Sequence, residues 1–229
     1  VTMSFIRDEN GVAIGILGIT RDITKRKAAE QNLVYLAYHD ALTGLANRGH
    51  LEEQLARTIA RANRSGSPSA LLFADLDGFK AINDEHGHEV GDLLLQQVAG
   101  RLRGLVRDFE TVARLGGDEF AVVLSDLTQP ADAAVVASRI CDQLVKPFFV
   151  EDLELRVSTS VGIASFPQDG QSSTELLKRA DEAMYRAKKG GRNGYRFYSE
   201  PLGDVDLAAV GVPNLAGPVY QAEGVAPLA

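Results

Sequence analysis

The heptapeptide RLGGDEF, residues 114–120, places two adjacent glycines and two acids inside an otherwise apolar stretch. Strand-like residues rich in Val, Ala and Leu lie on both sides of the glycines. A two-residue loop between strands favours a type I′ turn, which needs positive φ at both central residues, and glycine adopts this at little steric cost. We therefore predict a β-hairpin that turns at Gly116 and Gly117. Asp118 and Glu119 would then begin the returning strand.

A second acidic pair ends what we predict to be a neighbouring strand. SALLFADLD, residues 69–77, is an apolar run that closes with Asp75 and Asp77, which is typical of a buried strand. Acids at the ends of adjacent buried strands repel each other unless a cation or strong hydrogen-bond donors offset the charge. Oxygen-rich clusters of this kind suit Mg²⁺. A plain polar turn is the alternative, but the strongly apolar strand after the glycines argues against it.

The segment of residues 40–199 has the pattern of one folded unit. Helical spacing of apolar residues covers residues 88–107, 130–145 and 173–191, and strand-like runs cover residues 155–166 and 194–198. Strands alternate with helices, but the central pair is a hairpin. This order predicts an α+β fold in which a sheet of mixed or antiparallel strand order is layered with helices.

The two ends of the chain differ from this unit. Residues 1–22 alternate in polarity around a turn at residues 8–11, which predicts a hairpin, and we expect it to belong to a domain that continues upstream. Residues 23–39 have helical spacing and form either a helix packed on its own domain or a linker that pairs with a second copy. Residues 200–229 lack periodicity and Lys or Arg, which indicates a flexible tail.

The composition of the chain indicates which broad classes of protein it can belong to. The chain has 229 residues, 45% of them hydrophobic and 24% charged, which is ordinary for a globular protein. Its net charge of −7 argues against a general nucleic-acid binder. The single cysteine, Cys141, suits a reducing, cytoplasmic compartment. No apolar run is long enough to span a bilayer, so we expect no membrane contact within this segment.

Four separated motifs resemble the GGDEF-domain diguanylate cyclase family over about residues 38–199. They are HDALTGLANR (39–48), FADLDGFKAINDEHGHEVGD (73–92), the unbroken RLGGDEF, and ADEAMYRAKKGGRN (180–193). Their agreement in order makes the resemblance specific. It implies a sheet flanked by helices, like that of nucleotidyl cyclases and polymerase palms. Residues 1–27, ending in GITRDITKRK, resemble the C-terminal end of a PAS sensor domain.

The resemblance implies a bacterial signalling reaction in which two GTP molecules condense into cyclic di-GMP and two pyrophosphates. Each 3′-hydroxyl attacks the α-phosphate of the other GTP. Each subunit of the family binds one GTP, so the resemblance also implies that catalysis needs a homodimer.

The resemblance assigns the metal and catalytic residues as well. Asp75, Asp118 and the Leu76 carbonyl would hold Mg²⁺ or Mn²⁺, and Glu119 would assist with a second ion. Asp118 is the family's proposed general base, although a metal-bound carboxylate is a poor base. Lys80 would stabilise charge on the phosphates in the transition state. Without the resemblance, Lys80 reads as a solvated helix lysine.

Substrate contacts follow from the same motifs. By resemblance Asp92 and Asn83 would recognise guanine, because a carboxylate can accept from both N1–H and the N2 amine, and His88 would add a further contact. Lys188 and Arg192 would reach the β- and γ-phosphates. On the residues alone, Asn83 also suits a helix-end cap, Asp92 an N-terminal helix acid, and the basic pair a helix terminus.

One motif departs from the family. RDFE, residues 107–110, stands where many members carry an RxxD product-inhibition site. Arg107 can grip phosphate or stack on guanine, but Glu110 replaces Asp and moves its carboxylate by about 1.5 Å. The motif is therefore either a product-inhibition site or a surface pair at a helix end. A non-catalytic module that binds GTP or cyclic di-GMP is the alternative function, while Asp92 and Asn83 argue against an ATP-using cyclase.

Overall fold

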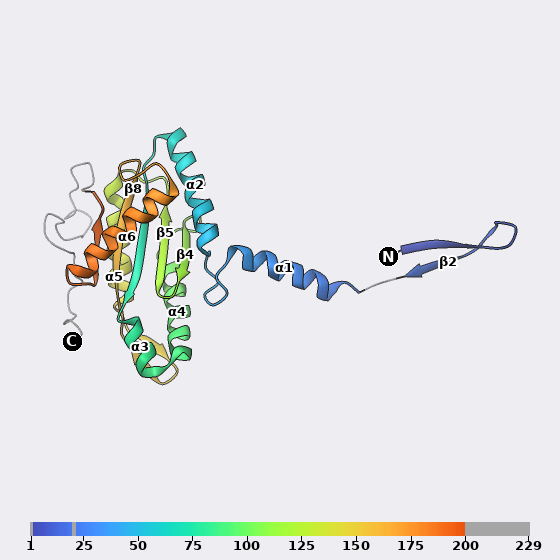
Figure 1. Ribbon diagram of the computed structural model, residues 1–229, viewed down its shortest axis with the longest axis horizontal. Coiled ribbons are helices and arrows are strands. Elements are labelled where there is room, and N and C mark those ends of the chain that lie inside the picture. The colour runs from blue at the N-terminus through green and yellow to red at the C-terminus, as the bar shows by residue number, and fades with distance from the viewer. Residues whose placement is uncertain (1, 20–21, 200–229) are drawn as a thin grey trace. The chain divides into compact units, whose positions relative to one another are not determined.

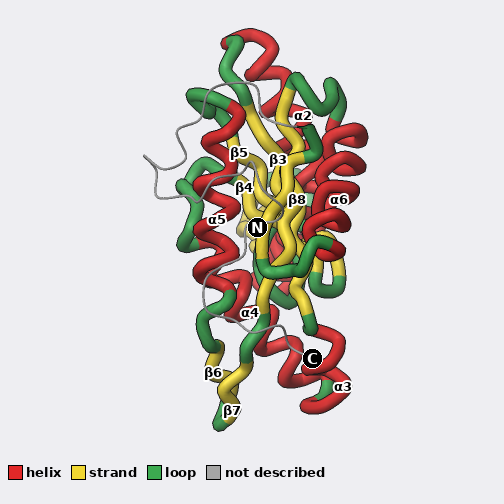
Figure 2. Tube along the Cα trace, turned by 90° about the vertical axis from the view of Figure 1, so that its left-hand side faces the viewer, coloured by secondary structure: helices red, strands yellow, loops and turns green. Residues whose placement is uncertain are grey.

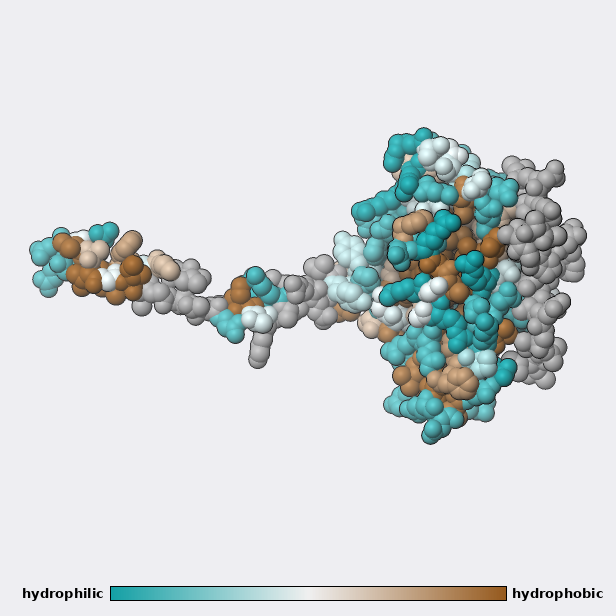
Figure 3. All heavy atoms as spheres, turned by 180° about the vertical axis from the view of Figure 1, so that it is seen from behind, coloured by the Kyte–Doolittle hydropathy of each residue, from teal (hydrophilic) through white to brown (hydrophobic). Residues whose placement is uncertain are grey.

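The computed structural model describes residues 2–19 and 22–199, so the tail predicted over residues 200–229 lies outside the described residues. The chain divides between residues 37 and 38 into two compact units. In the first, β1 (Thr2–Arg7) and β2 (Ala13–Ile19) form an antiparallel hairpin, and α1 (Thr24–Tyr38) follows it. Apolar side chains are exposed on this hairpin (Figure 3).

The second unit is built on a five-stranded sheet with strand order β4-β5-β3-β8-β9 (Figure 1). Only the β8–β9 pair is parallel, which confirms the predicted α+β fold with a mixed sheet. The strands are β3 (Ser69–Asp77), β4 (Thr111–Gly116), β5 (Glu119–Leu124), β8 (Ser158–Phe166) and β9 (Gly194–Phe197).

Helices cover both faces of the sheet. Figure 2 shows α5 on one side and α2 with α6 on the other. The helices of this unit are α2 (Arg48–Ser65), α3 (Phe79–His86), α4 (His88–Arg103), α5 (Ala133–Leu144) and α6 (Ser173–Lys189). None of the helices in the described part of the chain is long and apolar enough to cross a membrane.

The side chains of β3 divide between two cores. Leu71 and Phe73 pack in the cluster that includes α2 and α6, whereas Leu72 and Ala74 pack in the cluster that includes α4 and α5. Because successive strand residues point to opposite faces, Asp75 belongs to the α2 and α6 face. The sequence alternation therefore decides which helices the acidic end of this strand meets.

Gly162 in the middle of β8 lets α6 lie directly on the sheet. A Cβ at this position would stand 1.9 Å from the Ala180 carbonyl oxygen and 2.2 Å from the Met184 nitrogen. No other residue fits this contact, since α6 would have to move away from the sheet. The close approach brings the last turn of α6, which carries Lys188, to the end of β3.

Several element bounds differ from the sequence expectation. The helix predicted over residues 88–107 ends at Arg103, and the Gly104 nitrogen closes it on the Gly100 carbonyl. The strand predicted over 155–166 begins at Ser158, because Leu155 belongs to a small hairpin of β6 (Phe148–Val150) and β7 (Leu153–Leu155). The predicted helix start at Pro130 is a separate 3₁₀ turn, Pro130–Asp132.

Candidate active site

The GGDEF hairpin turns one residue later than predicted. Both glycines have positive φ, 145° at Gly116 and 51° at Gly117, but β4 continues through Gly116, which pairs with Glu119. The loop is therefore Gly117 and Asp118, and Asp118 is not among the residues with positive φ. The predicted type I′ turn at the two glycines is wrong, because a register shift after Arg114 lengthens β4. Asp118 lies in the turn itself, and only Glu119 begins the returning strand.

Arg114 fixes this turn to the start of the domain. Its Nε donates to the Gly117 carbonyl at 2.9 Å, and its Nη1 donates to Asp40 Oδ1 at 3.1 Å. Asp40 also accepts from the backbone nitrogen and the hydroxyl of Thr43. Burial raises the pKa of Asp40, but the hydrogen bonds from Thr43 and Arg114 outweigh it and hold the pKa below its usual range. Arg114 and Asp40 both stand in the motifs that resemble the family, but their sequence predicted no role for either.

Asp75 is the most perturbed acid at this end of the sheet. Burial raises the pKa of Asp75 to about 6; the charges of Asp118 and Asp77 add to the rise, and Lys188 opposes it. Lys188 Nζ lies 2.7 Å from Asp75 Oδ1. The carboxylate is thus held in a site that disfavours its charge even with a cation beside it.

Glu119 lies opposite Asp75 in the β3–β5 register. Burial raises the pKa of Glu119, Arg48 at 4.0 Å opposes that rise, and the charges of Asp181 and Asp118 increase it. Sequence reasoning missed Arg48 and Asp181, although both stand in quoted motifs. Asp118 completes the group, and its backbone carbonyl accepts from the Leu76 nitrogen at 3.3 Å.

Asp77 is a structural acid, unlike Asp75 two residues before it. Its Oδ1 accepts from the Ser160 hydroxyl at 2.8 Å. Its Oδ2 accepts from the Ser158 hydroxyl at 2.8 Å and from the Asn193 nitrogen at 3.2 Å. Arg192 Nε lies 3.9 Å from Asp77 Oδ1. Hydrogen-bond donors therefore offset the charge of Asp77, so no cation is needed to do so.

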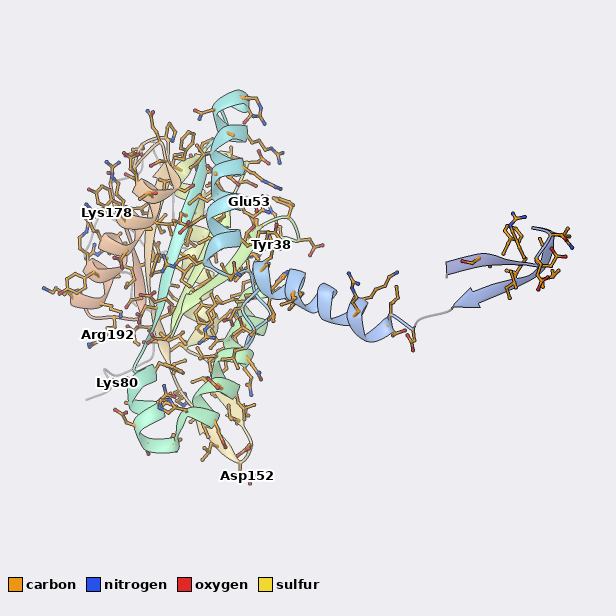
Figure 4. All side chains as sticks on the ribbon, turned by 45° about the vertical axis from the view of Figure 1, so that its right-hand side comes forward. Tyr38, Glu53, Lys80, Asp152, Lys178 and Arg192 are labelled. Carbon is orange, nitrogen blue, oxygen red and sulfur yellow. The ribbon has the colours of Figure 1, made fainter. Side chains whose placement is uncertain are left out.

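The substrate residues predicted by resemblance lie along α3 and α4. Lys80 is exposed in the first turn of α3, and His88 and Asp92 are exposed near the start of α4. Asn83 does not cap its helix with its side chain: among the described residues its buried Oδ1 has no hydrogen-bond partner. That oxygen fills the space of the missing Gly91 side chain, 1.9 Å from where a Cβ would stand. Figure 4 shows Lys80 and Arg192 on the same side of the domain.

The RDFE motif forms a turn in the loop between α4 and β4, so it is not a surface pair on a helix end. The Arg107 nitrogen donates to Glu110 Oε2 at 2.8 Å, and the Glu110 nitrogen donates to the Arg107 carbonyl at 3.0 Å. Both residues line a cavity of about 340 Å³ whose wall also includes His39, His50 and Arg103. Two arginines, Arg103 and Arg107, and two acids, Asp108 and Glu110, lie in its lining, so the arginines offer donors to a phosphate group and the acids offer acceptors to a base.

The acids suit a divalent cation by their chemistry. The charge of Asp118 helps to raise the pKa of both Asp75 and Glu119, which lie opposite each other in strand register, and hard cations such as Mg²⁺ prefer carboxylate oxygens. Within the described residues, no three His, Cys, Asp or Glu side chains already converge on one metal position.

Comparison with known proteins agrees with this geometry. The family model described as "Diguanylate cyclase, GGDEF domain" matches residues 37–194. The bifunctional diguanylate cyclase/cyclic di-GMP phosphodiesterase MucR of Pseudomonas aeruginosa is 48% identical over 179 residues, which are 78% of this chain and 26% of MucR. The chain thus spans about a quarter of the length of this curated relative.

Solved structures agree as well. The GGDEF domain of TpbB from Pseudomonas aeruginosa is 42% identical, with a TM-score of 0.69 over 70% of this chain and 94% of that one. The coiled coil and GGDEF domain of DgcB from Caulobacter crescentus, solved in complex with c-di-GMP, is 27% identical, with a TM-score of 0.67 over 76% of this chain and 92% of that one. This chain therefore belongs to the GGDEF family of diguanylate cyclase domains.

Proposed function

We propose that this domain is an active diguanylate cyclase that condenses two GTP molecules into cyclic di-GMP and two pyrophosphates. The observation that carries the proposal is the acidic end of the sheet. There the unbroken GGDEF turn sets Asp118 and Glu119 beside the buried Asp75, in a chain that belongs to the family. An acid that burial disfavours this strongly, next to a basic helix end, supports a site for a cation and a polyphosphate.

The side chains around the phosphates would have separate functions in metal binding, phosphate binding and proton transfer. Asp75, Asp118, Glu119 and the Leu76 carbonyl would hold Mg²⁺ or Mn²⁺, which when bound neutralises the triphosphate and lowers the pKa of the attacking hydroxyl. Lys80 would stabilise the charge that develops on the phosphates in the transition state. Lys188 and Arg192, at the end of α6, would bind the β- and γ-phosphates. Asp118 would accept the proton of the hydroxyl.

Guanine would be read between α3 and α4. The buried Oδ1 of Asn83 lacks a hydrogen-bond donor, and guanine presents donors at N1–H and at its N2 amine, whereas the matching edge of adenine presents an acceptor at N1. Asp92 would accept from N1–H and the N2 amine, and His88 would add a contact from the start of α4. The unpartnered oxygen of Asn83 supports this assignment.

Assembly follows from the number of sites. Residues 22–199 carry one such site in each chain, and the product contains two guanosine units, so two subunits would face each other as a homodimer. We further propose that residues 1–27 are the end of a PAS domain that supplies the input signal. We also propose that Arg107 and Glu110 bind the product at the cavity that they line, as a feedback site.

The experiment is turnover of GTP with Mg²⁺ by the chain, with cyclic di-GMP identified chromatographically. We expect product from GTP and not from ATP, and a specific activity that rises with protein concentration because catalysis needs two subunits. Asp118→Asn is the control that should lose product while keeping its thermal melt. If the chain binds GTP but forms no cyclic di-GMP at any concentration, it is a binding module instead.

A further inference from the structure

Lys188, expected to bind phosphate, instead pairs with a proposed metal ligand. Its Nζ lies 2.7 Å from Asp75 Oδ1. An ammonium at this distance occupies the oxygen that a divalent cation would need. Two cations beside one carboxylate repel each other, so a divalent ion that binds Asp75 must push the ammonium away.

The two partners differ in their freedom to move. The Lys188 side chain is 30% exposed, whereas that of Asp75 is 11% exposed. Asp75 is also held in register with Glu119 on one side and Ser160 on the other. The Gly162 contact with α6 fixes the helix that carries the lysine. The long lysine stem can therefore swing toward solvent or toward a ligand, while the carboxylate stays where it is.

We propose that Lys188 acts as a placeholder: it pairs with Asp75 in the absence of nucleotide and so keeps a free divalent ion away from that carboxylate. When a triphosphate binds, the Lys188 side chain moves from Asp75 to the phosphates, and the divalent ion takes its position. This rests on the proposed function, since it concerns the same site. A free cation must displace the lysine and leave it without a partner. A cation that arrives with a triphosphate gives the lysine a new anionic partner at once. Binding of cation and triphosphate is then cooperative, and the coupling is reciprocal.

Neighbouring cations do not share this position. Lys189 lies over the ring of Tyr185 at 4.8 Å, and Arg192 approaches Asp77, whose oxygens already accept three hydrogen bonds. Lys189→Met therefore removes the same charge from the same helix turn without freeing Asp75, which makes it the matched control. Lys188→Arg is the conservative variant, since it keeps a cation within reach of the carboxylate.

The first measurement is Mn²⁺ affinity of the full chain without nucleotide, from the free-ion signal in electron paramagnetic resonance. Loss of a charge-assisted hydrogen bond is worth about tenfold in affinity. We expect Lys188→Met to bind Mn²⁺ about tenfold more tightly than wild type, and Lys188→Arg and Lys189→Met to bind like wild type. In an Asp75→Asn background, the Lys188→Met change should have no effect on Mn²⁺ affinity. Thermal melts confirm that each variant is folded.

The second measurement is Mn²⁺ affinity with a non-reacting GTP analogue present. Wild type should gain much more affinity from the analogue than Lys188→Met does. A Lys188→Met variant that binds Mn²⁺ alone no better than wild type, or that keeps the full gain, overturns the proposal. Turnover of GTP separates this from the proposed function: cyclic di-GMP with unchanged Mn²⁺ binding refutes the placeholder alone. Tighter Mn²⁺ binding without any product refutes the cyclase alone.

Discussion

Replacing Asp75 by Asn should make the metal-free domain more stable while abolishing its activity. Burial, with the nearby charges of Asp118 and Asp77, raises the pKa of Asp75 from 3.8 to about 6 even though Lys188 lies beside it. The ionised Asp75 therefore lowers the free energy of unfolding of the domain at neutral pH. An amide keeps the shape of the side chain, can still accept from Lys188, and removes the buried charge.

The magnitude follows from the shift. About two pKa units correspond to roughly 3 kcal/mol, which is an upper bound for the gain. We expect Asp75→Asn to raise the free energy of unfolding by about 1–3 kcal/mol at about pH 8. Because the folded-state pKa is raised, wild type loses stability as pH rises from about 4 to about 6, and the variant does not. The gap between the two should therefore be largest above pH 6 and should close toward pH 4.

The assay is urea unfolding followed by circular dichroism in EDTA, across this pH range. Asp77→Asn is the matched control on the same strand. Asp77 accepts from Ser158, Ser160 and the Asn193 nitrogen, so its amide variant should lose about 1–3 kcal/mol. The reasoning fails if Asp75→Asn is no more stable than wild type at about pH 8. It also fails if the gap between them does not depend on pH.

Three further changes test other parts of the structure. Asp92→Asn should lower kcat/KM for GTP by about 10- to 150-fold, through the loss of a charged hydrogen bond to guanine, and a GTP preference over ATP that survives in competition assays would contradict this role. Gly162→Ala should cost about 2–4 kcal/mol in urea unfolding, because its Cβ would stand 1.9 Å from the Ala180 carbonyl oxygen, and wild-type stability would show that α6 yields easily. Arg107→Ala should relieve inhibition by added cyclic di-GMP and Glu110→Asp should strengthen it, and coinciding inhibition curves would remove the product site.

The sequence predicted the architecture well where one local pattern dominates. The apolar run of residues 69–77 is the fully buried β3, and the helix predicted over residues 173–191 spans Ser173–Lys189. The helix over residues 48–65 was missed although its signal was present. Leu51, Leu55 and Ile59 recur every four residues, and the Asn47 side chain caps the helix by accepting from the His50 nitrogen.

The candidate site was less predictable because its contacts join distant segments. Arg114 reaches Asp40 across 74 residues, and nothing local in either motif indicates that pairing. The turn was misplaced by one residue because the register shift in β4 depends on its pairing with β5. The position of Lys188 beside Asp75 depends on how closely α6 approaches Gly162, and a helical pattern carries no information about interhelical or helix–sheet distance.

The pairing of β3 has a consequence for how this domain can vary. All nine residues of β3 pair with β8 and six of them also pair with β5, and every one is buried. A deletion or insertion of a single residue inside β3 would turn Asp75 toward the hydrophobic core beneath α4 and would bring a leucine or alanine to the acidic site. Substitutions along this strand act one position at a time, whereas a change in its length would disturb the core and move the proposed metal-binding carboxylate together. We expect lineages of this domain to accumulate length changes in the loop after α4 or at the β6–β7 turn, and to keep the length of β3 constant.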